Sequence, residues 1–328
     1  MKEKEAAYLT TENLNIGYTH RNMENVLFEN LNLSLYPGQM ICFMGPNGAG
    51  KSSLIRTLAG LQKPLSGKVD LSNADIATGI ARQIAVVLTD RVNTPNLTVE
   101  EIVTFGRYPY LGWDIQLTDL DKRIVQSSID QIHLRPLLQK KLYELSDGQL
   151  QMAMIARALA QDTPVILLDE PTAHLDLNNR VEIMNLLRNL SHTTQKSILL
   201  ATHELDLALQ TADLIWLAGK NRNILAGLPE DLVLNSSFDE IFEFKGFDLK
   251  TGKIRHPPFR EIKIQLSGHG APYRWTRNAL ERNGFDVTEE PQQISVTLVQ
   301  DLSLLKWIVK KNDLQWEVDS IENLMNFL

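Results

Sequence analysis

The sequence has very little cysteine, no excess of basic residues and no long apolar run. Cys42 is the one cysteine among 328 residues, so an internal disulfide is excluded. The formal net charge is −7, which argues against nucleic-acid binding, because nucleic-acid-binding proteins carry clustered Lys and Arg. Residues 1–7 lack the apolar core of a signal peptide, and no apolar stretch is long enough to cross a bilayer. We therefore expect a cytoplasmic chain that reaches a membrane only through a partner.

A glycine-rich segment follows a short apolar run near the N-terminus. Residues 40–44 have the pattern of a buried strand, and residues 53–59 have helical character up to Gly60. The segment between them fits the spacing Gly, four residues, Gly-Lys-Ser, in which backbone N–H groups wrap phosphates. In that motif the lysine reaches the outer phosphates and the serine hydroxyl binds Mg²⁺. An isolated glycine-rich turn can also be a plain tight connection, but the flanking strand and helix favour a nucleoside triphosphate site. Its expected members are Gly45, Pro46, Asn47, Gly48, Ala49, Gly50, Lys51, Ser52 and Ser53.

A second buried strand ends in two acidic residues. Residues 165–168 are continuously apolar, as expected for a strand buried on both faces of a parallel sheet. Asp169 then emerges at the strand end, where its carboxylate can hold Mg²⁺. Glu170 follows and can orient or deprotonate the water that attacks the terminal phosphate.

The segment Leu145–Gln149 precedes a predicted helix and indicates the subclass. Ser146 and Gln149 have the spacing of a capping box at the start of that helix. Here the chain resembles the ATP-binding cassette (ABC) family, whose ATPase subunits carry Leu-Ser-Gly-Gly-Gln at this point, with Asp147 replacing one glycine. The resemblance implies that Ser146, Gly148 and Gln149 clasp the ATP of a second copy in a head-to-tail homodimer.

Further landmarks of that family recur between residue 8 and about residue 245. The resemblance implies that Tyr18 stacks on adenine, although a half-buried strand tyrosine is the alternative. It implies that Asp176, in the segment 173–176, takes part in communication between the subunits, and an ordinary helix cap is compatible with that role. It also implies that His203, which follows another buried strand, contacts the γ-phosphate and helps to hold the attacking water.

One position departs from the family pattern. The strand at 83–88 ends at Thr89, where the family usually has a glutamine that contributes to the Mg²⁺ and water network. Thr89 offers a shorter hydroxyl, and Asp90 could reach the metal only through water. We expect Thr89 to take the place of that glutamine, with coupling to the membrane partner tuned differently.

The region between the phosphate loop and Ser146 bears on what the ATPase drives. Thr98 and Glu101 form a second capping box at the start of a helix. The sequence Gly-Arg-Tyr-Pro at 106–109 looks like that of the import ATPases for iron-siderophore chelates, haem and cobalamin. Aromatic, Arg-containing loops often make partner contacts, and a plain loop packed on the helical subdomain is the alternative.

The tail after residue 256 is a different module. Pro257 and Pro258 form a short connector, and residues 262–266, 294–298 and 314–318 alternate apolar and polar side chains as strands do. Residues 271–283 and 303–311 are predicted helices, and a short strand is expected near 285–287. The order β-α-β-β-α-β predicts a ferredoxin-like layout, to which we assign a regulatory or dimer-stabilising role.

The expected fold is therefore α/β, a P-loop NTPase of ABC type with a mixed sheet core and a helical subdomain at roughly 92–160. This domain spans residues 1–256, and a small α+β ferredoxin-like domain spans 257–328. The expected function is an ATPase, with ATP and Mg²⁺ as cofactors, that powers import of an iron-siderophore chelate, haem or cobalamin. Its expected partners are a second copy of itself, an integral membrane permease and, indirectly, a periplasmic or surface binding protein. The alternative is a soluble ABC ATPase that drives a protein assembly step without a permease.

Overall fold

The computed structural model describes residues 6–21, 23–72, 79–89, 96–113, 115–254, 256–301, 304–312 and 314–328. The chain divides into two compact units, Met1–Glu243 and Phe244–Leu328. The Pro257-Pro258 pair predicts a later division, after residue 256. The observed boundary is earlier than the predicted one because a small hairpin belongs to the second unit. This hairpin consists of β11 (Phe247–Asp248) and β12 (Lys253–Ile254), which pair with each other.

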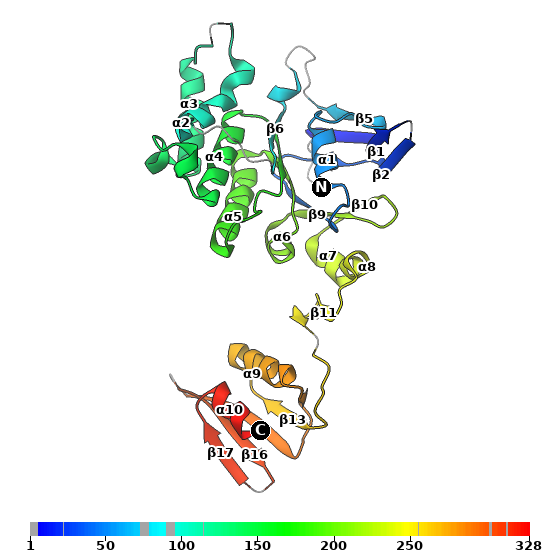
Figure 1. Ribbon diagram of the computed structural model, residues 1–328, viewed down its shortest axis with the longest axis vertical. Helices are drawn as coiled ribbons and strands as arrows, with labels where there is room; N and C mark the ends of the chain where they lie inside the picture. The colour runs from blue at the N-terminus through cyan, green and yellow to red at the C-terminus, as the bar shows by residue number, and fades with distance from the viewer. Residues whose placement is uncertain are drawn as a thin grey trace. The chain divides into compact units, whose positions relative to one another are not determined.

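A six-stranded sheet lies at the centre of the first unit in its described residues (Figure 1). Its strand order is β10-β9-β4-β8-β7-β6, and each neighbouring pair is parallel except β10 with β9. Strands β4, β7 and β8 are buried along their whole length, which explains their unbroken apolar runs. The strand bounds are β4 (Met40–Met44), β6 (Ile84–Val87), β7 (Val165–Asp169), β8 (Ser197–Ala201), β9 (Leu214–Ala218) and β10 (Ile224–Gly227).

An antiparallel sheet packs against this core. Strand β1 pairs with β2, β3 and β5, and the inward side chains join a single apolar cluster with α1 and the central strands. Phe28 and Phe43, one from each sheet, lie with their ring centroids 5.9 Å apart inside this cluster. The bounds are β1 (Leu9–His20), β2 (Met23–Leu31), β3 (Ser34–Leu35) and β5 (Ser66–Leu71).

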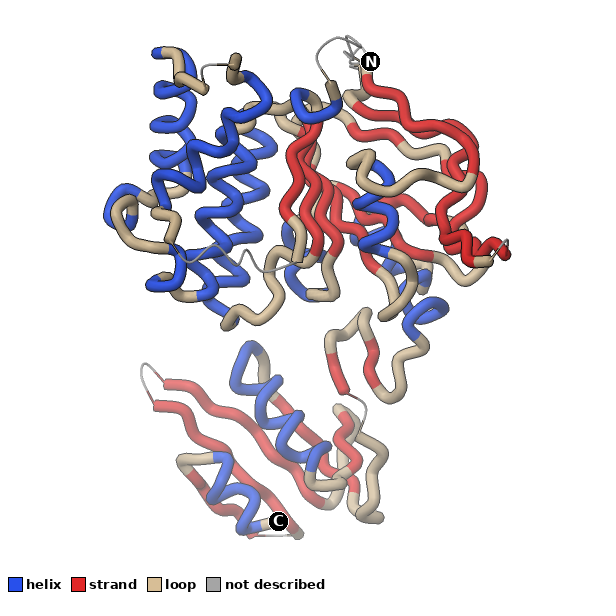
Figure 2. Tube along the Cα trace, turned by 45° about the horizontal axis from the view of Figure 1, so that its top comes forward, coloured by secondary structure: helices blue, strands red, loops and turns tan. Residues whose placement is uncertain are grey.

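Helices α2, α3 and α4 gather on one side of the central sheet and form the helical subdomain (Figure 2). Both capping boxes predicted for this unit, at Thr98 and at Ser146, are present, and Thr118 forms another. Within the described residues, no helix is both long and apolar enough to span a membrane. The helix bounds are α1 (Lys51–Leu58), α2 (Val99–Thr104), α3 (Asp119–Gln131), α4 (Asp147–Ala160), α5 (Leu177–Thr194), α6 (Leu205–Thr211), α7 (Pro229–Leu234) and α8 (Ser237–Phe242).

The Gly-Arg-Tyr-Pro segment packs into the helical subdomain through its arginine. Arg107 is only 3% exposed, and its Nε donates to Asp121 Oδ1 at 2.8 Å. Its Nη1 donates to the carbonyl oxygen of Ala160 at 2.9 Å, and its guanidinium lies 3.8 Å from the ring centroid of Tyr110. Arg107 is therefore a structural residue that ties α3 to the end of α4, while Tyr108 is left exposed.

The second unit is a sheet with helices α9 and α10 packed on it. Among the described residues the strand order is β14-β13-β15-β16-β17, with β13 parallel to β14 and β15 and the remaining pairs antiparallel. The element order is β-α-β-β-β-β-α, so the predicted ferredoxin-like layout is wrong. The bounds are β13 (Lys263–Ser267), α9 (Gly270–Arg282), β14 (Asp286–Thr288), β15 (Ile294–Asp301), β16 (Leu304–Lys311), β17 (Leu314–Val318) and α10 (Ile321–Phe327).

The layout differs because the predicted helix at 303–311 is the strand β16. Trp307 and Val309 are buried in the core of this unit and Leu305 packs against them, which is the period of two that a strand produces. Ile308 and Val309 are β-branched and fit a pleated surface better than a helix. The run ends at Asn312, which resembles a helix C-terminus, and the structure shows that Asn312 instead has the positive φ of a turn to β17.

Candidate functional site

The glycine-rich loop lies at the carboxyl end of β4 and leads into α1. Gly50 is the residue before the helix and has φ 95°, a left-handed conformation that favours glycine. A Cβ at Gly50 would also lie 3.0 Å from the ring of Phe28. The loop therefore keeps its backbone N–H groups at the start of α1, where a helix favours anions.

The side chain of Lys51 is hydrogen-bonded to the first residues of this loop. Its side chain is buried, and Nζ donates to the carbonyl oxygens of Gly45 at 3.0 Å and Pro46 at 3.4 Å. Burial lowers the pKa of Lys51, while the carboxylates of Glu170 and Asp169 act in the opposite direction. The ammonium group is thus fixed within the loop and faces the acidic strand end.

Ser52 and Asp169 meet below the loop. Asp169 is the last residue of β7 and is 3% exposed, and Ser52 Oγ donates to Asp169 Oδ1 at 3.0 Å. Burial raises the pKa of Asp169, and the hydrogen bond from Ser52 opposes this shift. Thr89, at the end of β6, donates from Oγ1 to the main-chain oxygen of Asp169 at 2.9 Å. Asp90 lies outside the described residues.

Glu170 and His203 face each other at the ends of β7 and β8. Glu170 has φ 50°, and its N–H donates to the carbonyl oxygen of Ala201 at 2.9 Å, which turns the chain at the strand end. His203 Nδ1 lies 3.3 Å from Glu170 Oε2, and the imidazole is half exposed. The structure thus brings the two predicted catalytic side chains together.

An ion pair that the sequence did not predict, Arg180 with Glu204, lies next to His203. His203 Nε2 lies 3.4 Å from Glu204 Oε1, which accepts a hydrogen bond from Arg180 Nη1 at 2.8 Å. The same guanidinium donates through Nε to the carbonyl oxygen of Leu175 at 2.6 Å. Arg180 therefore links the segment 173–176 to the Glu170–His203 pair. Arg180 could have been recognised from its position, because it lies four residues after Asp176, about one helical turn further along α5.

The start of α4 is tied to the same segment. Ser146 and Gln149 complete the predicted capping box, each side chain bonded to the other's backbone N–H at 3.2 Å. A Cβ at Gly148 would lie 2.9 Å from Cγ of Asn179, so the glycine allows close packing there. Asn179 in turn donates to both carboxylate oxygens of Asp176, at 2.9 Å and 3.0 Å. Asp176 is thus a helix cap of α5 that also supports the start of α4.

Thr89 and Tyr18, two further predicted site residues, contact different neighbours of the phosphate loop: Thr89 contacts Asp169, and Tyr18 contacts α1. Thr89, Asp147 and Glu170 line a pocket of about 60 Å³ between the start of α4 and the end of β7. Tyr18, on β1, is half exposed, and its hydroxyl is hydrogen-bonded to Ser53, the third residue of α1. The tyrosine ring is therefore held next to the helix that carries Lys51 and Ser52.

Two family models match this chain. Residues 28–173 match the ABC transporter family, and residues 261–328 match the iron ABC transporter C-terminal domain. The second match begins shortly before β13 and covers the sheet of the second unit, with α9 and α10.

Individual relatives extend these matches over most of the chain. An uncharacterized ABC transporter ATP-binding protein of Methanocaldococcus jannaschii is 38% identical over 287 residues, which are 85% of this chain and 98% of that protein. The petrobactin import ATP-binding protein FpuD of Bacillus anthracis is 37% identical, over 72% of this chain and 87% of that protein.

A solved structure agrees with the fold of the first unit. The dimeric ATP-binding cassette MJ0796, in a post-hydrolysis state bound to ADP and Pi, superposes with a TM-score of 0.58 and 26% identity. The match covers 67% of this chain and 98% of that one. The chain therefore belongs to the family of ABC transporter ATPases, enzymes that bind and hydrolyse ATP.

Proposed function

We propose that this ATPase powers a membrane importer for an iron chelate and that two copies of the chain enclose two ATP molecules. The observation that carries the proposal is the convergence of Lys51, Asp169, Glu170 and His203 at the carboxyl ends of β4, β7 and β8. In sheets of this kind ligands bind beyond those strand ends. The import assignment rests on the petrobactin import relative and on the iron ABC transporter C-terminal domain.

The loop binds the triphosphate through its backbone and through Lys51. The backbone N–H groups of the loop cradle the α- and β-phosphates, with Pro46 contributing none, and the ammonium group of Lys51 reaches the β- and γ-phosphates. Tyr18 stacks on the adenine, since its half-exposed ring lies beside α1.

The donor set next to the loop fits Mg²⁺. Ser52 Oγ and Asp169 Oδ1 are oxygen ligands 3.0 Å apart, and the buried carboxylate gains from a cation because burial opposes its negative charge. Thr89 donates to the main-chain oxygen of Asp169, and its hydroxyl oxygen keeps lone pairs that can accept. Ser52 and Asp169 would hold a Mg²⁺ ion there, and the ion would supply positive charge to offset that of the phosphates.

Glu170 serves as the general base. Its carboxylate accepts a proton from the water that attacks the γ-phosphorus, while the bond to the ADP oxygen breaks and phosphate leaves. His203 contacts the γ-phosphate and holds that water, and its imidazole is oriented by Glu170 on one side and Glu204 on the other.

The second copy completes the site. Ser146 is exposed at the start of α4, Gly148 is buried behind it and Gln149 is partly exposed, and this helix start contacts the ATP held by the partner's loop. Closure around ATP and reopening after hydrolysis move an integral membrane permease, which receives cargo from a periplasmic or surface binding protein. The chain thus lies at the inner face of the membrane. A permease-free ATPase is disfavoured, because the petrobactin relative is an import protein.

The test is to purify tagged Glu170→Gln protein with ATP from detergent-solubilised native membranes and to identify what accompanies it. A many-helix permease in stoichiometric amount supports the importer, and the substrate of that permease identifies the cargo. Recovery from the soluble fraction without a permease would overturn the proposal.

A further inference from the structure

Asparagine followed by glycine occurs at two places in this sequence, Asn47-Gly48 in the phosphate loop and Asn283-Gly284 directly after α9. The backbone nitrogen of such a glycine can attack the side-chain amide before it, because glycine has no Cβ to hinder the approach. The rate of this reaction depends on whether the side-chain amide and the glycine N–H are held by other groups. One chain therefore contains the same reactive pair in two different surroundings.

The pair in the phosphate loop is unprotected. Asn47 and Gly48 are both exposed, and within the described residues neither the Asn47 side chain nor the Gly48 N–H forms a hydrogen bond. The two residues lie in a turn that the Ala49 N–H closes by donating to the Pro46 carbonyl oxygen at 3.1 Å. Gly48 has φ 79°, and beyond its chain neighbours no heavy atom lies within 4 Å of the position that a Cβ would take. No neighbouring group thus blocks a rearrangement of this backbone.

The charges around the loop also favour the reaction. The attacking group is a deprotonated backbone nitrogen, and the attack places negative charge on the amide oxygen. The N-terminus of α1 favours negative charge at this point, and the Lys51 ammonium group is bound to the carbonyl oxygens of Gly45 and Pro46 in the same loop. The features that suit the loop to phosphate therefore also stabilise the charged intermediate when the loop is empty.

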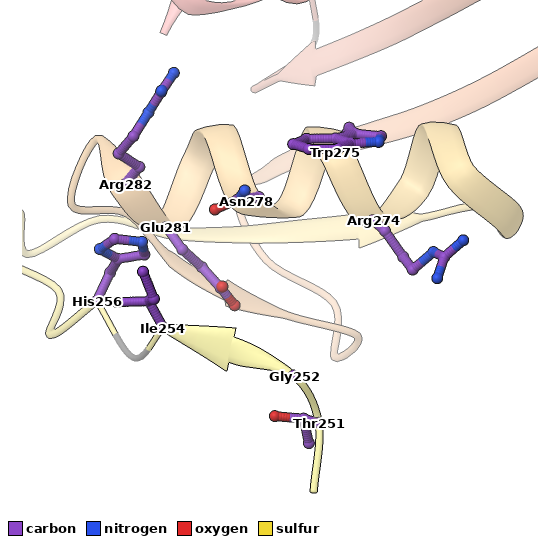
Figure 3. Close-up of a pocket in the computed structure, with 9 residues that line it drawn as sticks. All are labelled: Thr251, Gly252, Ile254, His256, Arg274, Trp275, Asn278, Glu281 and Arg282. Atoms are coloured by element: carbon purple, nitrogen blue, oxygen red, sulfur yellow. The ribbon is translucent and has the colours of Figure 1, made fainter. Parts of the chain in front are cut away.

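The second pair is protected at both reacting groups. Arg282, labelled in Figure 3, is the last residue of α9, and Asn283 follows it. The Asn283 Nδ2 donates to the Ala279 carbonyl oxygen at 2.8 Å, and the Gly284 N–H donates to the Glu281 carbonyl oxygen at 2.9 Å. Both hydrogen bonds have to break before the nitrogen can reach the amide carbon. Asn283 is thus a matched control within the same molecule.

We propose that Asn47 is a site of spontaneous deamidation and that bound ATP protects it. The Gly48 nitrogen forms a bond to Asn47 Cγ, and its proton leaves with the amide group as ammonia, which closes a succinimide ring. Water then opens the ring at the side-chain carbonyl to aspartate, or at the backbone carbonyl to isoaspartate.

The modification and ATP binding exclude each other. The new carboxylate lies in the loop that takes the triphosphate and repels it. Protection rests on this loop binding ATP as proposed above, because the Gly48 N–H is then engaged by a phosphate and cannot attack. Occupancy by ATP would thus decide how long each molecule keeps a working phosphate loop.

The test incubates full-length wild-type and Glu170→Gln protein at mildly alkaline pH, without nucleotide and, for the variant, also with Mg²⁺ and saturating ATP. Mass spectrometry of peptides produced in acid, where deamidation is slow, follows Asn47 and Asn283, and isoaspartate methyltransferase detects the isomer. Without nucleotide, Asn47 should deamidate at least about tenfold faster than Asn283, where two hydrogen bonds must break first. ATP should slow the reaction of Asn47 at least about tenfold and leave that of Asn283 unchanged.

Two variants test the effect on ATP binding by isothermal titration. Asn47→Asp reproduces the charged product and should bind ATP at least about tenfold more weakly than Asn47→Gln, its uncharged match. The proposal is overturned if Asn47 deamidates no faster than Asn283, if ATP that binds leaves the Asn47 rate unchanged, or if the two variants bind ATP equally. Wild-type protein that binds no ATP in the same titration would instead overturn the proposed phosphate site, and the comparison of the two asparagines without nucleotide is independent of that result.

Discussion

At the scale of single residues, Glu170 is expected to be needed for ATP hydrolysis but not for ATP binding. Replacing its carboxylate by the amide in Glu170→Gln removes the base but keeps the size of the side chain. We expect ATP turnover to fall by about 10²–10⁴-fold, the range for a general base, while ATP still binds. The variant should accumulate as a dimer at saturating ATP in size-exclusion chromatography with light scattering.

The matched control is Glu182→Gln, an exposed carboxylate on α5, which should hydrolyse ATP at the wild-type rate. A Glu170→Gln protein that stays monomeric with ATP bound would contradict the two-copy arrangement.

Arg180 belongs to the same scale, because its single guanidinium holds both Leu175 and Glu204. Lysine keeps the charge but cannot make both bonds in the same fork geometry. We expect Arg180→Lys to lower kcat about tenfold, equivalent to about 1.4 kcal/mol, with KM for ATP nearly unchanged. Steady-state kinetics separates these two constants.

Arg188→Lys is the control for Arg180→Lys, since Arg188 lies on the same helix and makes one exposed contact with the Gln210 carbonyl oxygen. An equal loss of kcat in both variants would show that the effect comes from a general change in α5, and would contradict a specific role for the link from Arg180 to His203.

At the scale of secondary-structure elements, the buried pair Arg107–Asp121 joins α3 to the end of α4. Asp121→Asn leaves a buried guanidinium without its counter-charge, which costs about 3–5 kcal/mol in such pairs. Chemical denaturation followed by circular dichroism measures the loss. Arg107→Met, added to Asp121→Asn, removes the unpaired charge and should recover part of the stability; no recovery would contradict the explanation.

The ion pair Arg107–Asp121 should also make the stability of the fold depend on pH. The hydrogen bond from the Thr118 hydroxyl, together with Arg107, holds the pKa of Asp121 below its usual range. The ionised carboxylate therefore stabilises the fold above its ordinary pKa, and this contribution is lost as the pH falls through the lowered, folded value. The denaturation midpoint of wild type should decline more steeply with acid than that of Asp121→Asn. Parallel declines would show that other groups dominate.

Elements also show how far the sequence predicts this molecule. The phosphate loop, the strand before Asp169 and the cap at Ser146 are specified by local spacing, and the structure contains all three. Local spacing does not specify the strand in the segment 303–311. This strand forms because it pairs with β15 and β17, and a local sequence pattern carries no information about such pairing. Arg180 was missed for a similar reason, since its partners come from a loop and from another strand end. Long-range contacts, rather than propensity, decide these positions.

At the scale of the whole molecule, each unit has its own apolar core, so the first should keep its activity without the second. The residues assigned to ATP all lie between Tyr18 and His203. A chain ending at Glu243 retains α8 and the ion pair of Lys220 with Glu243. We expect it to hydrolyse ATP within about twofold of the full chain in the absence of other proteins, because every residue assigned to ATP belongs to the first unit, which has its own core. A coupled phosphate-release assay measures this, and Lys51→Ala in the shortened chain supplies the background. A truncated chain that is folded by circular dichroism yet inactive would show that the second unit takes part in the catalytic cycle itself.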